Sequence, residues 1–158
     1  MGQLQIIDGK PVKVVDARTS PEALERRLKH QSAVLEIGIT PEVLDEIVEE
    51  FYTRVKAHPV LAPLFDEPIG DRWPDHLAKM KSFWTSVALN SGTYSGKPVP
   101  AHQVLSSVEP WHFELWLDLF RQTLRDTTKS DEATEFMMFR AERIAARLQM
   151  AMFGGVGL

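Results

Sequence analysis

Four polar aromatic side chains of this sequence stand next to apolar neighbours at helical spacing or beside a turn-rich segment. Tyr52 and Trp116 lie on the apolar sides of two predicted helices, His76 borders the apolar stripe of a third, and His102 follows a Gly- and Pro-rich stretch. Tyrosine hydroxyls and tryptophan N–H groups donate hydrogen bonds, and imidazoles bind metals or exchange protons. Taken singly, each position also has a structural interpretation, as a core aromatic or a boundary histidine.

Other kinds of chemistry find little support in the residue types. The chain has no cysteine, which excludes disulfides, thiolate zinc sites, iron–sulfur clusters and cysteine nucleophiles. The five histidines form no close ligand pair, and HExxH, GxGxxG and phosphate-cradling GKS or GKT motifs are absent. Carboxylates are common, but in stretches such as EALERRLK they alternate with basic residues, which is typical of a solvated helix face.

Length and composition indicate one ordinary globular domain. The 158 residues are 44% hydrophobic and 25% charged, with a formal net charge of -4, so a sizeable core is expected. The missing basic excess argues against nucleic-acid and anionic-membrane partners. We see no secretory signal and no apolar run long enough to span a bilayer, and we therefore expect a cytoplasmic protein.

The first 19 residues differ from the rest of the chain. Two short β-prone runs, QLQII and KPVKVV, flank Asp8-Gly9, which favours a type I′ turn and a β-hairpin. Pro11 restricts the second run to an edge position.

Helical signals dominate from Ser20 onward. Helix starts are indicated at Ser20, Thr40, Pro74, Pro110 and Ser130, and apolar residues recur at spacings of three and four after each. We predict an all-α fold of about five helices with irregular connections around residues 58–72 and 90–110, the first of them stiffened by prolines.

Four blocks of sequence resemble a known family when taken in order. They are FYTRVKAHPVLAPLF, WPDHLAKMKSFW, GTYSGKPVPAHQVL and HFELWLDLF, within residues 36–152, and together they resemble the group III truncated haemoglobins of the 2/2 globin family. The resemblance implies a shortened globin fold, a 2-over-2 helical sandwich that holds haem b (iron protoporphyrin IX). It divides the chain into an N-terminal extension, residues 1–35, and a truncated globin domain, residues 36–158.

The resemblance also implies a role for individual residues. His102 would be the proximal iron ligand, and Tyr52, His76 and Trp116 would line the distal side, where small ligands bind. His76 could contact the ligand, gate the pocket or coordinate iron, and the sequence does not choose among these. The remaining haem contacts implied by the resemblance are Phe65, Met80, Phe83 and Trp84, and groups that could meet the propionates are Arg54, Arg72, Lys79 and Tyr94.

The family implies binding of O2, NO, CO or similar ligands. Bound dioxygen carries negative charge at its outer atom, and hydrogen bonds to charged groups contribute about 1.5–3 kcal/mol each. Two donors, Tyr52 and Trp116, would slow dissociation by roughly 10²–10⁴. Such retention suits NO dioxygenation, peroxide reduction or sensing, with an unidentified reductase as electron donor, better than oxygen transport.

Two other functional classes remain open at this point. One is a cofactor-free helical interaction module in which the aromatic side chains only build a core. The other is a small hydrolase or lyase with His76 or His112 as general base, although no nucleophile or metal motif accompanies them. His112 lies four residues before Trp116 and could border the pocket, but a surface position is the favoured expectation.

Overall fold

The computed structural model describes residues 3–7, 10–14, 20–91, 94, 96, 98–103, 105 and 107–154, of which 3–7, 10–14, 99, 100 and 103 are described through the backbone alone. The predicted hairpin strands are confirmed. β1 (Gln3–Ile7) and β2 (Lys10–Val14) pair antiparallel, with Ile7 opposite Lys10. The turn predicted at Asp8-Gly9 lies outside the described residues.

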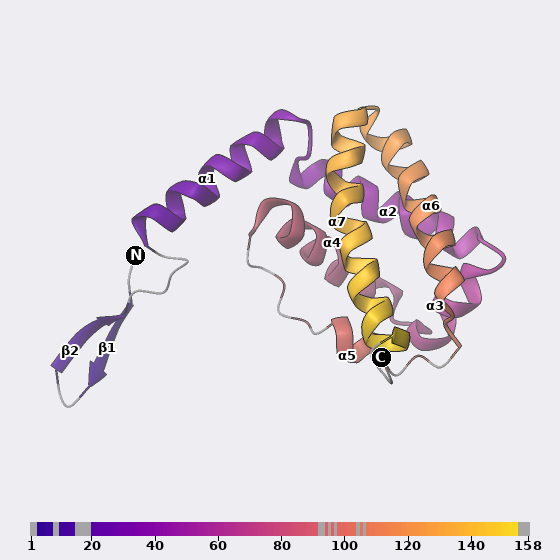
Figure 1. Ribbon diagram of the computed structural model, residues 1–158, viewed down its shortest axis with the longest axis horizontal. Helices are drawn as coiled ribbons and strands as arrows, with labels where there is room; N and C mark the ends of the chain where they lie inside the picture. Colours follow the sequence, from indigo (N-terminus) through magenta and orange to yellow (C-terminus); the bar gives the residue numbers. More distant parts are fainter. Residues whose placement is uncertain are drawn as a thin grey trace.

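All other regular structure in the described part of the chain is helical (Figure 1). The helices are α1 (Pro21–Glu36), α2 (Pro41–Ala57), α3 (Leu61–Ile69), α4 (Trp73–Leu89), α5 (Pro98–Gln103), α6 (Pro110–Thr128), α7 (Asp131–Gln149) and the π-helical turn η1 (Met150–Gly154).

The predicted helix starts are confirmed by the way the first turns are capped. The side chains of Ser20, Thr40 and Ser130 each accept a hydrogen bond from the backbone N–H three residues further on, at 3.2, 3.1 and 3.1 Å. These bonds satisfy N–H groups that have no partner within the helix. At the other end of α1, Gly38 has φ +94°, a conformation that favours glycine and stops the helix.

The two connections predicted to be irregular each contain a short helix, α3 and α5, so that part of the prediction is wrong. Prolines suggested a loop in both places, but Pro63 and Pro98 occupy first turns, where a missing N–H costs nothing. Pro68 is inside α3, one residue before its end. The ring of His58 opens α3, because its Nδ1 accepts hydrogen bonds from the N–H groups of residues 60 and 61, both at 3.1 Å.

The long helices form two packed pairs. α2 packs on α4 and α6 packs on α7, and the pairs meet mainly where α2 crosses α6 (Figure 1). This is the 2-over-2 sandwich expected from the resemblance. α1 reaches the sandwich at the end of α4, where His30 Nε2 lies 3.1 Å from Ala88 O and Gln31 donates to Leu89 O at 2.8 Å. These bonds use carbonyls that the last turn of α4 leaves without helical partners.

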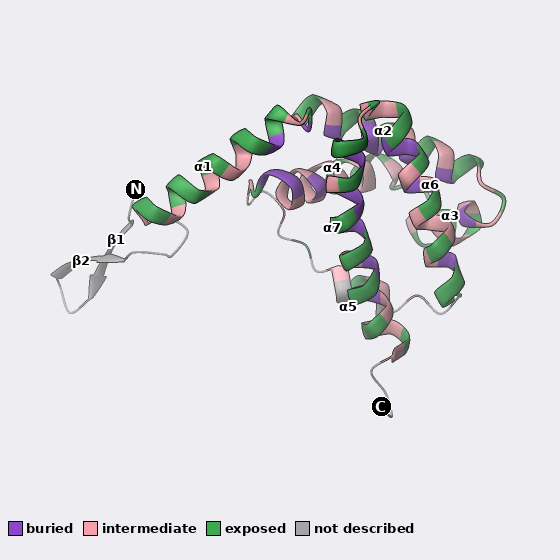
Figure 2. Ribbon diagram, turned by 45° about the horizontal axis from the view of Figure 1, so that its top comes forward, coloured by how far each residue is buried: buried purple, intermediate pink, exposed green. Residues whose placement is uncertain are grey.

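The core lies where the two pairs face each other, and buried residues line the inner sides of the long helices (Figure 2). Trp84 of α4 stacks on Phe120 of α6 at 5.0 Å between ring centroids, and Phe120 stacks on Trp116 at 5.4 Å. The apolar residues predicted at helical spacing in α2 face this core: Val43 is half-buried, and the others are buried, namely Leu44, Ile47, Val48, Phe51, Tyr52 and Val55.

Candidate functional site

His102 lies in α5, a helix of 6 residues, rather than in a loop. Its ring is half-buried, and Nδ1 lies 2.6 Å from the carbonyl oxygen of Pro98. A carbonyl can only accept, so Nδ1 carries the proton and donates it. In the neutral imidazole, Nε2 is then the nitrogen whose lone pair is free for a metal. Histidines that bind metals usually have this arrangement, because the second hydrogen bond fixes both tautomer and ring orientation.

The segment leading into α5 is tied to α4 at Tyr94. The backbone N–H of Tyr94 donates to Ser86 Oγ at 3.0 Å, and its ring meets Phe83 edge-on at 5.1 Å. Burial raises the pKa of the Tyr94 hydroxyl. Gly96 lies directly under this ring, since a Cβ there would be 2.2 Å from the Tyr94 oxygen. The YxG part of the motif therefore allows the Tyr94 ring to lie against the backbone.

His76 of α4 presents a polar atom that has no partner. Its ring is half-buried, and its Nε2 is one of the buried side-chain nitrogens without a hydrogen bond in the described part of the chain. Burial, and to a smaller extent the charges of Lys79 and His102, lower the pKa of His76 to about 4. His76 is therefore neutral near pH 7.

Tyr52 packs beside His76, and its hydroxyl makes no hydrogen bond to a described residue. Its side chain is 5% exposed and meets His76 edge-on at 5.1 Å and Phe65 at 5.9 Å between centroids. Burial raises the pKa of Tyr52 well above its ordinary value, so the hydroxyl keeps its proton. No described residue forms a hydrogen bond with that hydroxyl. It remains available as a donor.

Trp116 of α6 approaches the same region from the other helix pair. Its ring is half-buried, stacked on Phe120 and edge-on to Phe51 at 5.5 Å. Phe51 is also edge-on to Tyr52, at 5.1 Å, so Trp116 and Tyr52 flank one phenylalanine. Among the described residues, none accepts a hydrogen bond from the Trp116 indole.

The remaining predicted contact residues lie in two environments. Phe65, Met80 and Phe83 are half-buried at the edge of the core, whereas Trp84 is 3% exposed and stacked on Phe120 inside it. Trp84 therefore lies one layer behind the half-buried residues.

Two functional expectations change with the structure. His112 is not a surface residue: it is 8% exposed, and its Nδ1 accepts from the Glu109 N–H at 2.9 Å as part of a capping box that opens α6. The sequence reading missed this because a histidine is an unusual N3 partner in a capping box. Trp73, to which the sequence assigned no role in the site, contacts both Tyr52 and His76. No local pattern distinguishes such a residue from a core residue.

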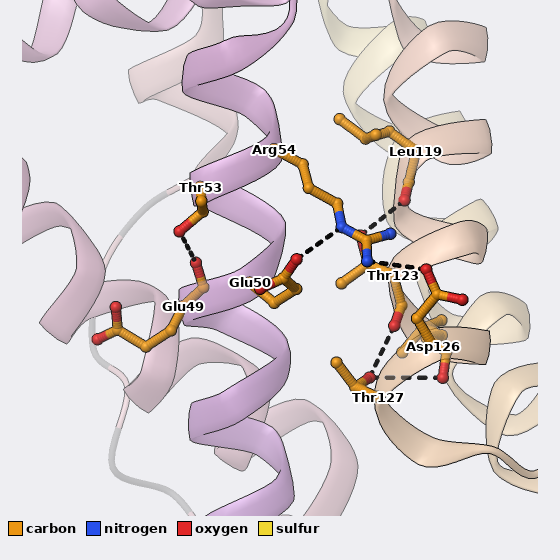
Figure 3. A network of polar contacts seen from close by, with 9 residues as sticks. Glu49, Glu50, Thr53, Arg54, Leu119, Thr123, Asp126 and Thr127 are labelled. Carbon is orange, nitrogen blue, oxygen red and sulfur yellow. Dashed lines mark hydrogen bonds and ion pairs between the residues drawn. The ribbon is translucent and has the colours of Figure 1, made fainter.

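Of the candidate propionate partners, Arg54 is already engaged elsewhere. Its guanidinium bonds Glu50 at 2.9 Å and Asp126 at 2.8 Å, which joins α2 to α6 (Figure 3), and these carboxylates raise its pKa. Arg72 donates to Pro68 O at 2.7 Å and so closes the end of α3.

Comparison with known proteins shows the family of the chain. Residues 34–151 match the sequence model of the bacterial-like globin family. The chain is 31% identical over 118 residues to the group 3 truncated hemoglobin ctb of Campylobacter jejuni, an alignment that covers 73% of this chain and 92% of that protein. The crystal structure of a group III truncated hemoglobin from Campylobacter jejuni superimposes with a TM-score of 0.70 at 31% identity, covering 76% of this chain and 96% of that chain.

The chain therefore belongs to the bacterial-like globin family, and within it to the group III truncated haemoglobins. As a member it binds haem and small diatomic ligands such as oxygen, which decides against a cofactor-free interaction module and against a hydrolase. No helix in the described part of the chain is long and apolar enough to cross a membrane.

The residues of the site fit a haem. His102 offers an imidazole whose Nδ1 is already committed to a carbonyl, an arrangement that is usual for histidines that bind metals through Nε2. His76 holds a buried nitrogen that lacks a protein partner, a cost that proteins avoid unless another group satisfies it. Aromatic and sulfur-containing side chains border the same region, which suits a large apolar ring.

Proposed function

We propose that His102 is the proximal ligand of haem b and that Tyr52, His76 and Trp116 face the opposite, ligand-binding side. One observation supports this most directly: the Nδ1–H of His102 is bonded to Pro98 O at 2.6 Å, which leaves Nε2 as the coordinating atom. The position of His102 in α5, a separate helix from the α4 that carries His76, supports the same assignment.

The proposed cofactor is bound without covalent bonds to the protein. The chain has no cysteine to form the thioether bonds of a c-type haem, which supports haem b. Phe65, Met80 and Phe83 would contact the ring directly, and Trp84 would support them from the core. The half-buried state of the first three is what a residue beside a large ligand would have.

When bound, the haem iron supplies a site where a diatomic ligand is held. Tyr52 and Trp116 would donate hydrogen bonds to the charged atom of that ligand, because both donors lack other partners among the described residues. The neutral His76 adds a third polar atom, as a donor or an acceptor according to its tautomer. Two hydrogen bonds to a charged atom contribute about 3–6 kcal/mol, or roughly 10²–10⁴ in the dissociation rate.

This arrangement supports tight oxygen retention. A ligand that leaves slowly can react before it escapes, so the site suits NO detoxification, peroxide reduction or sensing better than oxygen delivery. Either of the first two reactions needs an electron donor, for which we propose a separate reductase. We propose a catalytic role for the haem, as an NO dioxygenase or a peroxidase-like centre, on the same grounds.

We further propose that residues 1–35 form an extension to a globin domain of residues 36–158. α1 contacts the domain through the bonds of His30 and Gln31 to the end of α4 and through Val34, which is 2% exposed. The last part of the extension is therefore packed on the domain.

The visible spectrum of the purified protein tests the proposal. We expect an intense violet absorption band that moves on reduction and again on addition of carbon monoxide. A colourless protein that takes up no added haem would contradict the proposal. A protein that binds haem as tightly after His102→Ala would contradict the ligand assignment alone.

A further inference from the structure

We propose that Trp73 is a positioning residue that holds the imidazole of His76 toward the ligand-binding side, and that Asp66 and Lys56 hold the Trp73 indole in place. This inference rests on the proposed function, because it concerns how one of its distal residues is oriented. Trp73 is the first residue of α4 and lies one helical turn before His76.

The His76 ring lies between two other rings. It is edge-on to Tyr52 at 5.1 Å and edge-on to Trp73 at 5.6 Å, with interplanar angles of 88° in both cases. Tyr52 and Trp73 also touch each other, at 5.8 Å and 62°. The three rings form a closed group in which each limits the rotation of the other two. Edge-to-face contacts of this kind are favourable as well as restrictive.

No hydrogen bond to a described residue fixes the direction of this imidazole. Its buried Nε2 has no hydrogen-bond partner, so its orientation must come from packing. A side chain released from such packing would distribute over three staggered χ1 rotamers. The packed rings therefore determine whether the His76 imidazole faces the site all of the time or only part of the time.

The Trp73 indole is held by charged groups of two other helices. Its Nε1 donates to Asp66 Oδ1 of α3 at 3.1 Å, and Lys56 Nζ of α2 lies 4.9 Å from the ring centroid. The ammonium group is attracted to the face of the indole ring, and the carboxylate accepts a hydrogen bond from its N–H. The indole is therefore held at its face and at its edge. In this way α2, α3 and α4 meet at the residue that orients His76.

Three variants test the inference in steps. Trp73→Phe keeps a ring against His76 but loses the bond to Asp66, Asp66→Ala removes the acceptor alone, and Trp73→Leu removes the ring. Trp111→Phe is the matched control: this indole also lies at the start of a helix, donates to a carboxylate, Glu109 Oε2, at 3.1 Å and touches a histidine, but it belongs to α6.

The first measurement uses haem-free protein. Nuclear Overhauser effects between the rings of His76 and Tyr52 report whether the imidazole stays in place. We expect them to weaken by about threefold in Trp73→Leu, as one rotamer becomes three, to weaken less in Trp73→Phe and Asp66→Ala, and to stay unchanged in Trp111→Phe.

The second measurement uses the carbon monoxide complex, whose C–O stretching band responds to polar groups beside the ligand. We expect one dominant band to split or move in Trp73→Leu toward the position seen in His76→Leu. Wild-type Overhauser effects in both Trp73 variants, or a band unchanged in Trp73→Leu but shifted in His76→Leu, would overturn the inference. If the protein bound no haem, the proposed function would fail, and the haem-free measurement would still decide the role of Trp73.

Discussion

Removal of the Tyr52 hydroxyl should accelerate oxygen release without harming the fold. The side chain is 5% exposed, and its hydroxyl makes no hydrogen bond to any residue in the described ranges. Tyr52→Phe therefore removes a donor without breaking a hydrogen bond to any residue that the structure describes. We expect the free energy of unfolding of the haem-free protein to change little, since no hydrogen bond between described residues is lost.

The kinetic effect follows from the charge on the bound ligand. A hydrogen bond to a charged acceptor contributes about 1.5–3 kcal/mol, and each 1.4 kcal/mol is a factor of ten. Tyr52→Phe should therefore raise the oxygen dissociation rate by about 10- to 100-fold, and Trp116→Phe should do the same. If the two donors act independently, the effects multiply in the double variant. Because both rings flank Phe51, a coupling term is expected in the double-mutant cycle.

Stopped-flow displacement of oxygen measures this rate. Carbon monoxide is the internal control, since it carries less charge when bound and should be affected less by the same substitutions. Trp111→Phe is the protein control and should leave both rates unchanged. If Tyr52→Phe and Trp116→Phe both left the oxygen dissociation rate at the wild-type value, the hydrogen-bonding account of retention would be refuted.

Three further predictions follow from the structure. The pKa of His76 is about 4 in the folded protein against an ordinary value of 6.5. Between these two pH values the unfolded chain binds more protons than the folded one, so the free energy of unfolding should fall as the pH is lowered from 6.5 to 4. Urea unfolding of haem-free His76→Leu should lack this contribution to the pH dependence. Arg54→Leu removes one ion pair within α2 and one between α2 and α6. It should lower the free energy of unfolding by about 0.5–2 kcal/mol in the same assay. Lys29→Ala removes an exposed ion pair and should change the free energy of unfolding by less than about 0.5 kcal/mol. Gly96→Ala puts a methyl group 2.2 Å from the Tyr94 oxygen and should speed haem transfer to an acceptor globin; a wild-type transfer rate would show that this contact does not support α5.

The long helices could be predicted from the sequence because their signals are local. A capping hydroxyl before a proline marks the start of α1 and of α2, and the buried ladder of α2 repeats at helical spacing. α3 and α5 were missed because prolines normally argue against helices, and whether a proline falls in a first turn depends on where the helix begins.

The residues of the candidate site likewise fall into those that the sequence predicts and those that it does not. His102, Tyr52, His76 and Trp116 were found through sequence blocks that resemble the family, and their residue types suggest the chemistry. The contact of Trp73 with Tyr52 depends on how α4 packs on α2, which no local spacing records. The ion pair of Arg54 with Asp126 is of this kind too, since Asp126 is 72 residues away in the sequence (126 − 54).

The coordination of haem by His102 is tested most directly by removing the side chain and supplying its imidazole separately. His102→Gly should lose the wild-type haem spectrum and release haem faster, and free imidazole should restore the spectrum, while His30→Ala should resemble the wild type throughout. A His102→Gly protein with an unaltered spectrum and unaltered haem retention in the absence of imidazole would contradict the account.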